Sequence, residues 1–183
     1  MANIKKYLLA FVVCLSALLF NTSFAYAEKS HIAIVDMEKI LAESLAGKSL
    51  EKQLKEKREA FQQEFTQREN QLLETEKTLI QEKSNLTADA FEEKRKQFEL
   101  GLLETRNLFQ KRRNALDKGL DKALAELREN VMQITADISE RQGFSIVLTR
   151  DSVVIADKEL DITNQILDKM NSSMKTIPLV VAQ

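Results

Sequence analysis

The residue types that usually perform catalysis or bind metals are scarce in this sequence. The chain has one histidine, His31, and one cysteine, Cys14. A single imidazole supplies neither a Ser-His-Asp triad nor a zinc site, which takes three or four protein ligands. No glycine-rich loop follows a strand-like run, so nothing indicates nucleotide binding. We therefore predict no catalytic residue, no metal ion and no cofactor.

Acidic residues are abundant, but their spacing is typical of a solvated helix. Most alternate with basic residues four positions away, as in Glu51/Lys55 and Glu92/Lys96. Such pairs stabilise an exposed helix surface and do not assemble an acid–base site. The sequence therefore predicts a binding or structural protein, not an enzyme.

Residues 1–27 have the pattern of a secretory signal peptide. Lys5 and Lys6 precede an apolar run from Tyr7 to Phe20, and small residues surround Ala27, where we expect cleavage. The alternative is an uncleaved anchor, but the run is shorter than the roughly 20 residues that cross a bilayer. We expect an exported chain that begins at Glu28 and has no cysteine.

The charge of the mature chain is nearly balanced. Of the 27 Lys and Arg residues, Lys5 and Lys6 belong to the leader, which leaves 25 against 28 acidic residues. A net charge of −3 gives no strong field toward nucleic acid, so we predict no nucleic-acid partner.

Residues 48–142 consist mainly of good helix formers, with one interruption near 84–89. Asn85 and Thr87 are turn and N-cap residue types. We predict an antiparallel helical hairpin with its tip at 84–89, an outgoing arm before it, and a return arm that Gly143 caps. Gly101, in the middle of the return arm, costs about 1 kcal/mol relative to alanine, and it is either a hinge or a glycine that the helix simply tolerates.

Apolar spacing predicts a packed base and a looser tip. At the base of the return arm, apolar residues alternate at spacings of four and three, the pattern of a coiled-coil core: Leu120, Leu124, Leu127, Val131, Ile134 and Ile138. Toward the tip, Arg68 and Thr75 interrupt the seam.

Short strand-like runs flank the predicted hairpin. We expect residues 32–35 to pair with a β-hairpin formed by 144–149 and 153–155, followed by a helix with Ile166 and Met170 on its buried face. The fold class is therefore α+β and mostly α, with the hairpin inserted into a small β-rich body made of 28–47 and 143–176, and a flexible tail at 177–183. So small a body needs other copies to complete its core. Its expected assembly residues are Ile32, Ile34, Val35, Phe144, Ile146, Leu148, Val153 and Ile155.

The arms also carry candidate binding residues. Loosely packed apolar side chains usually mark an interaction surface, although packing within the hairpin is the alternative for each. They are Phe61, Phe65, Leu72, Leu79, Leu86, Phe91, Phe98, Leu102 and Phe109. Three basic clusters are secondary candidates: Lys55, Lys57 and Arg58; Lys94, Arg95 and Lys96; and Lys111, Arg112 and Arg113.

These features resemble the Skp/OmpH family of periplasmic chaperones over essentially the whole chain. The most specific segments are Ile32-Ala-Ile-Val-Asp-Met-Glu-Lys-Ile40, Ala46-Gly-Lys48, Gly143-Phe-Ser-Ile-Val-Leu148 and Ala156-Asp-Lys-Glu-Leu-Asp-Ile-Thr163. The resemblance implies a jellyfish-like homotrimer, with a central β-barrel body and three hairpin tentacles around a cavity. It also implies a periplasmic location and unfolded outer-membrane proteins as clients, held without ATP.

One feature departs from the family. Residues 77–99 contain five basic and five acidic residues, whereas family tips are basic. This balance weakens the expectation of lipopolysaccharide or anionic-lipid binding at the tip. We therefore expect a holdase chaperone that contacts clients through its arms. The alternative is a coiled-coil spacer or tether of the cell envelope that has no clients.

Overall fold

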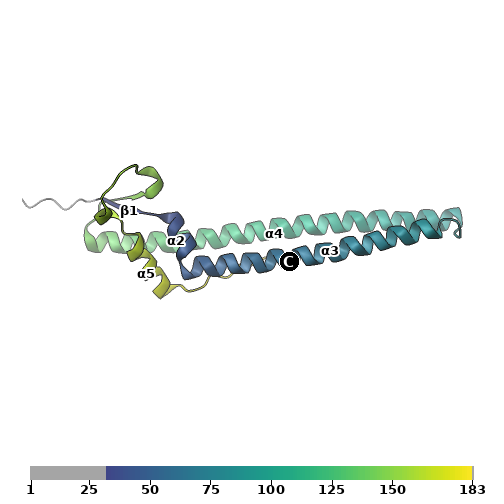
Figure 1. Cartoon of the computed structure of the whole chain (residues 1–183), viewed down its shortest axis with the longest axis horizontal. Helices are drawn as coiled ribbons and strands as arrows, with labels where there is room; N and C mark the ends of the chain where they lie inside the picture. The colour runs from purple at the N-terminus through teal and green to yellow at the C-terminus, as the bar shows by residue number, and fades with distance from the viewer. Residues whose placement is uncertain (1–31, 183) are drawn as a thin grey trace, which may run out of the picture. The chain divides into compact units, whose positions relative to one another are not determined.

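The computed structural model describes residues 32–182, which are mostly helical with one small sheet (Figure 1). The predicted leader with its cleavage site at Ala27 lies outside the described residues, as does His31. In chain order the elements are β1 (Ile32–Val35), α2 (Met37–Glu43), α3 (Leu45–Glu82), α4 (Ala88–Gln142), β2 (Ile146–Thr149), η1 (Arg150–Ser152), η2 (Lys158–Leu160) and α5 (Thr163–Ser173).

The chain leaves the sheet through two capped helices. Asp36 ends β1 and caps α2, because its side chain accepts a hydrogen bond from the Lys39 N–H at 2.8 Å. Ser44, fully buried, separates α2 from α3 and accepts a hydrogen bond from the Gly47 N–H. A β-carbon at Gly47 would lie 1.7 Å from the carbonyl oxygen of Leu41, so this bend requires glycine.

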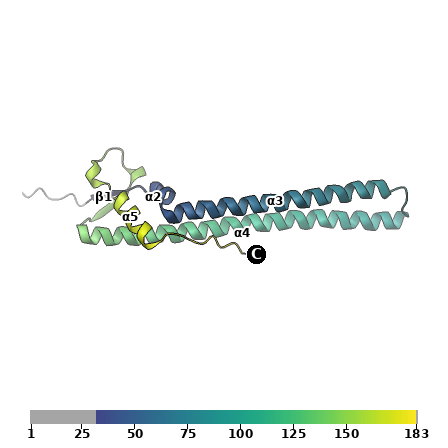
Figure 2. The same cartoon turned by 60° about the horizontal axis from the view of Figure 1, so that its bottom comes forward.

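Helices α3 and α4 run antiparallel, side by side, and form the predicted hairpin (Figures 1 and 2). The tip falls between Glu82 and Ala88, where the Thr87 hydroxyl accepts a hydrogen bond from the Ala90 N–H. The sequence predicted this tip at 84–89. The outgoing helix begins at Leu45, three residues before the predicted boundary, because Ser44 provides its cap.

The return helix ends as its sequence predicts. Gly143 has φ 76°, a left-handed conformation that glycine adopts without strain, and its N–H donates to the carbonyl oxygen of Ser139. Among the predicted base residues, Leu127, Val131 and Ile138 are buried, whereas Leu120, Leu124 and Ile134 are partly buried against the core. Leu116 and Ala123 are buried as well, so the packed face of α4 is wider than the predicted seam.

Strands β1 and β2 pair in parallel, with Ile32 opposite Ile146 and Val35 opposite Thr149. The hairpin is therefore inserted between the strands of one sheet, as expected. The predicted β-hairpin is wrong, because residues 150–152 form a 3-10 turn and 153–155 form no strand within the described chain. Val154 and Ile155 are 96% and 90% exposed and meet no strand partner in residues 32–182.

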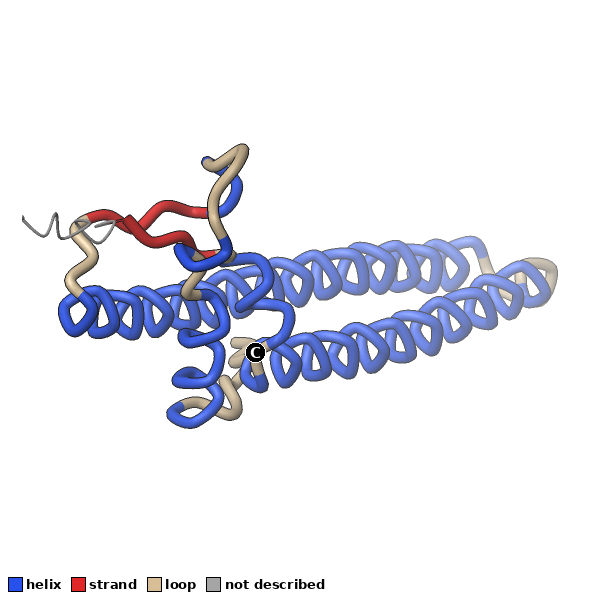
Figure 3. Tube along the Cα trace, turned by 60° about the vertical axis from the view of Figure 1, so that its left-hand side comes forward, coloured by secondary structure: helices blue, strands red, loops and turns tan. Residues whose placement is uncertain are grey.

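The core lies where α5, the base of α4 and the inner face of the sheet meet (Figure 3). Ile166 and Met170 of α5 are fully buried, as the spacing predicted. They pack with Ala33 and Val35 of β1 and with Ile40 of α2.

The segment after α5 differs from its prediction. Residues 177–183 were expected to form a flexible tail, but Ile177 and Leu179 are 1% and 6% exposed and belong to the core. The side chain of Gln53 fixes this segment by hydrogen bonds to its backbone.

Candidate binding surfaces of the hairpin and the body

Aromatic side chains fill the middle of the seam between α3 and α4. Phe65 and Phe109 meet edge to face, with ring centroids 4.5 Å apart. Beside them, the Arg112 guanidinium lies over the Phe61 ring at 5.6 Å and forms an ion pair with Glu64 at 3.0 Å. These candidate client-binding residues thus pack inside the hairpin, the alternative that the sequence left open.

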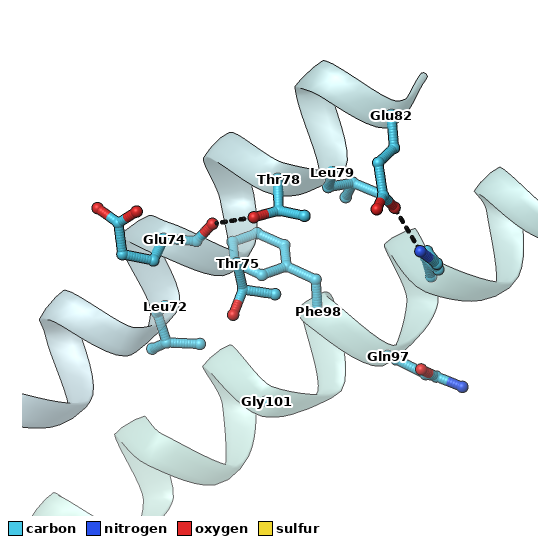
Figure 4. A pocket seen from close by; sticks show the side chains of 10 residues that line it. Leu72, Glu74, Thr75, Thr78, Leu79, Glu82, Gln97, Phe98 and Gly101 are labelled. Atoms are coloured by element: carbon cyan, nitrogen blue, oxygen red, sulfur yellow. Dashed lines mark hydrogen bonds and ion pairs between the residues drawn. The ribbon is translucent and has the colours of Figure 1, made fainter. Parts of the chain in front are cut away.

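Nearer the tip the seam opens into a cleft of about 570 Å³. Leu72, Leu79 and Phe98 provide its apolar wall, and Phe98 extends from α4 toward α3 (Figure 4). The ion pair between Glu82 and Lys94 lies at the edge of the cleft nearer the tip. The predicted loosening of the arms is confirmed, because Leu79 is the one large apolar side chain described as buried between residues 51 and 115.

Gly101, which the sequence offered as a hinge, lines this cleft. The α4 helix runs unbroken through this position. A β-carbon there would lie 3.7 Å from the Leu72 side chain, an ordinary contact.

Gly101→Ala is therefore expected to raise the free energy of unfolding by about 1 kcal/mol, because alanine loses less backbone entropy in a helix. Urea denaturation followed by circular dichroism, at a fixed chain concentration, measures the change. A loss of stability would show that the helix needs glycine at this position.

Four exposed apolar residues on the arms were missing from the sequence prediction. Leu73 and Ile80 on α3 are 53% and 66% exposed, and Leu100 and Leu103 on α4 are 50% and 54% exposed. Leu73 and Ile80 are seven residues apart, and Leu100 and Leu103 are three apart, so each pair shares a helix face. Of the predicted apolar set, Leu102 is similarly exposed, at 41%.

Several residues of the basic clusters form ion pairs with glutamates of the same chain. Lys55 pairs with Glu59, Lys94 pairs with Glu82, and Arg95 pairs with both Glu92 and Glu99. The part of the chain that the structure describes provides no ion pair for a second group, formed by Lys57, Arg58, Lys96, Lys111 and Arg113. The charges of Lys55, Lys94, Arg95 and Arg112 are thus partly compensated by neighbouring carboxylates.

The outer face of the sheet carries large apolar side chains. Ile32 on β1 and its partner Ile146 on β2 are 37% and 52% exposed, and Leu148 is 38% exposed. Ile34 and Val35 were also predicted to be assembly residues, but both are buried within the single chain. Phe144 packs against the core as well.

Thr163 joins the start of α5 to the end of β1. Its hydroxyl accepts a hydrogen bond from the Asp36 N–H at 2.9 Å, and its own N–H donates to the Asp161 carboxylate at 2.9 Å. Burial would raise the pKa of Asp161, but the Thr163 hydrogen bonds and the charges of Arg150 and Lys39 outweigh it and hold the pKa below its usual value.

Acid is therefore expected to weaken this junction. A carboxyl group with a lowered pKa stabilises the fold above its unfolded pKa of about 3.9, and this contribution is lost as the pH falls through the folded pKa. The difference in unfolding free energy between the native chain and Asp161→Asn should shrink between pH 6 and pH 2. Urea denaturation at each pH measures it, and a constant difference would contradict the assignment.

Residues 32–182 contain no cluster of His, Cys, Asp and Glu side chains that fits a metal ion. Among the described residues, no helix has the length and apolar composition needed to cross a membrane. The exposed apolar surfaces of the arms and of the sheet are thus the candidate functional features.

Comparisons with known proteins agree with this arrangement. The family described as outer membrane protein (OmpH-like) matches residues 31–170. A crystal structure from Caulobacter crescentus, of a protein described as a candidate outer membrane chaperone (OmpH-like), has the same fold with a TM-score of 0.79. The two chains are 21% identical, and the match covers 84% of this chain and 91% of the other. No curated protein matches the sequence.

Proposed function

Because this chain belongs to the OmpH-like outer membrane protein family, we propose that it is a chaperone of the holdase type. It binds unfolded outer-membrane β-barrel proteins and other exported proteins in the periplasm and keeps them from aggregating before membrane insertion. Binding requires no ATP. The leader, residues 1–27, directs export and is removed after Ala27.

The observation that carries the proposal is the set of exposed aliphatic side chains on a long hairpin. Leu73, Ile80, Leu100 and Leu103 are each at least half exposed, on arms that are rich in charged residues. Weak apolar contacts spread along such a surface bind an unfolded chain without selecting one sequence. Because the holdase binds the unfolded state, it lowers the concentration of free, aggregation-prone chains by mass action.

Assembly into a homotrimer with a shared β-barrel is part of the proposal. The outer face of the sheet presents Ile32, Ile146 and Leu148, and Val154 and Ile155, which follow η1 in the chain, are almost fully exposed. The two-stranded sheet packs on helices with one face only, and strands of other copies would cover its exposed apolar face. Three hairpins around one body would then enclose the client.

A client-free spacer remains the competing function, and the cleft argues against it. A structural rod needs a filled seam throughout its length, whereas this hairpin has an apolar opening of about 570 Å³ beside Gly101. Binding of anionic lipid or lipopolysaccharide is a secondary expectation. Such binding would use the basic residues that form no ion pair in the described chain, which are Lys57, Arg58, Lys96, Lys111 and Arg113.

The test is to dilute a denatured outer-membrane barrel protein into buffer with and without this protein and to follow light scattering. We expect suppression at stoichiometric amounts without ATP. Aggregation that proceeds unchanged at a molar excess of the protein would refute the holdase function and favour the spacer. Native mass measurement of the same sample determines the number of chains.

A further inference from the structure

The C-terminal segment, residues 177–181, lies along the hairpin as an extended chain (Figure 2). Ile177 and Leu179 are buried, while Pro178 and Val180 between and after them are exposed. This alternation is that of a β-strand packed on one face. Residues of both helices contact the segment, Gln53 from α3 and Gly119 from α4, so it occupies a groove along the hairpin base.

The groove recognises the backbone of its occupant. The Gln53 side-chain amide donates to the carbonyl oxygen of Ile177 at 2.8 Å, and its side-chain oxygen accepts from the Leu179 N–H at 2.9 Å. One amide thus pairs with two backbone groups in the way that a neighbouring strand would. The Gln53 side chain also donates to Ser49, one helical turn earlier, which fixes its orientation. Such recognition is independent of side-chain identity.

Gly119 provides the space for that backbone. A β-carbon at this position would lie 2.4 Å from the carbonyl oxygen of Val180, closer than any real contact. Gly119 is in the middle of α4, where glycine costs about 1 kcal/mol relative to alanine. The groove therefore combines a backbone clamp, an opening for a main chain and two apolar positions separated by one residue.

We propose that this groove is a binding site for an extended client segment with an apolar residue at every second position, and that residues 177–181 are its built-in competitor. Strands of membrane-spanning β-barrels have this alternation, so an unfolded barrel protein offers many matching segments. The tail covers the apolar groove when no client is present, and a client strand replaces it. This inference rests on the proposed function for the class of client.

The first experiment uses the unmodified mature protein and amide hydrogen exchange. The Leu179 N–H is protected by its bond to Gln53, so exchange in residues 176–182 reports whether the tail is in the groove. Addition of a denatured barrel protein, at a ratio that suppresses its aggregation, is expected to accelerate this exchange at least about tenfold. Unchanged exchange together with full suppression would overturn the inference but leave the holdase function intact.

The second experiment opens the groove without deleting any part of the chain. Ile177→Ser with Leu179→Ser removes the two anchors of the tail. A synthetic peptide with the sequence of residues 174–183 is then expected to bind this variant at least about tenfold more tightly than it binds the native protein. Equal peptide affinity for the variant and the native protein would overturn the inference, once circular dichroism shows that the variant is folded.

A matched pair of substitutions in α4 locates the site. Gly119→Ala, added to the tail variant, is expected to abolish peptide binding because its β-carbon fills the opening. Gly101→Ala is the same substitution in the same helix, and its β-carbon meets nothing closer than 3.7 Å, so binding should persist. If both substitutions abolish binding, or neither does, the peptide binds elsewhere and the inference is wrong.

A second copy of this chain is the other possible occupant. Exchange of tails between copies would increase the native mass when intact protein is mixed with the tail variant. That result would overturn the client assignment in favour of a swapped assembly.

Discussion

Aspartate at both Ile146 and Leu148 is expected to dissociate the proposed homotrimer into single chains that remain helical. Both side chains are on the outer face of β2, 52% and 38% exposed in the single chain. Their replacement therefore costs the isolated fold little. Packed against other copies, however, each carboxylate would be removed from water without a partner, at a cost of several kcal/mol.

Sedimentation velocity measures the outcome directly. Ile80→Asp is the matched control, because Ile80 is also largely exposed but lies far along the arm. The control should sediment like the native protein. If the variant with both Ile146→Asp and Leu148→Asp keeps the native mass, the outer face of the sheet is not the contact between chains.

Serine at Leu73, Ile80, Leu100 and Leu103 together is expected to reduce suppression of client aggregation at least about tenfold. Each leucine or isoleucine that a client covers is worth about 1.5 kcal/mol or more when fully buried, so partial contact at four positions exceeds the 1.4 kcal/mol that a tenfold change requires. The fold should be preserved, because all four side chains are exposed in it. Light scattering at increasing chaperone concentration gives the amount needed for half suppression.

Met132→Ser provides the comparison for the arm variant. Met132 is 54% exposed, but it lies toward the C-terminal end of α4, about thirty residues from Leu100 and Leu103. Its substitution should leave suppression unchanged. If the fourfold variant also suppresses aggregation like the native protein, clients bind elsewhere, and the cleft at Leu72 and Phe98 becomes the next surface to alter.

Local sequence signals determined much of this fold. Thr87 and Gly143 mark the two ends of α4 because capping depends on side-chain and backbone chemistry at one position. The spacing of Ile166 and Met170 identified the buried face of α5 because a helix repeats every 3.6 residues. Arg68 and Thr75 interrupted the seam in the sequence, and both line clefts in the structure.

Features that depend on distant partners were not predictable from the sequence. Val154 and Ile155 have strand-like side chains, but the described chain offers them no strand to pair with. Ile177 precedes and Leu179 follows Pro178, a context typical of fraying, whereas in the structure the distant Gln53 side chain binds their backbone. The heptad through Leu72 and Leu79 located the seam, while the exposure of neighbouring Leu73 and Ile80 depends on how the two arms are placed.

The parallel pairing of β1 with β2 has a consequence for the order of folding. Ile32 and Ile146 are paired although more than a hundred residues separate them, and closing so long a flexible loop costs about 4 kcal/mol of chain entropy. The α3–α4 hairpin has local contacts at its tip, so it can zip from Thr87 toward its base and bring the strand ends together as it grows. Helical arms would then form before the sheet, and pairing of β1 with β2 would complete the folding of the chain.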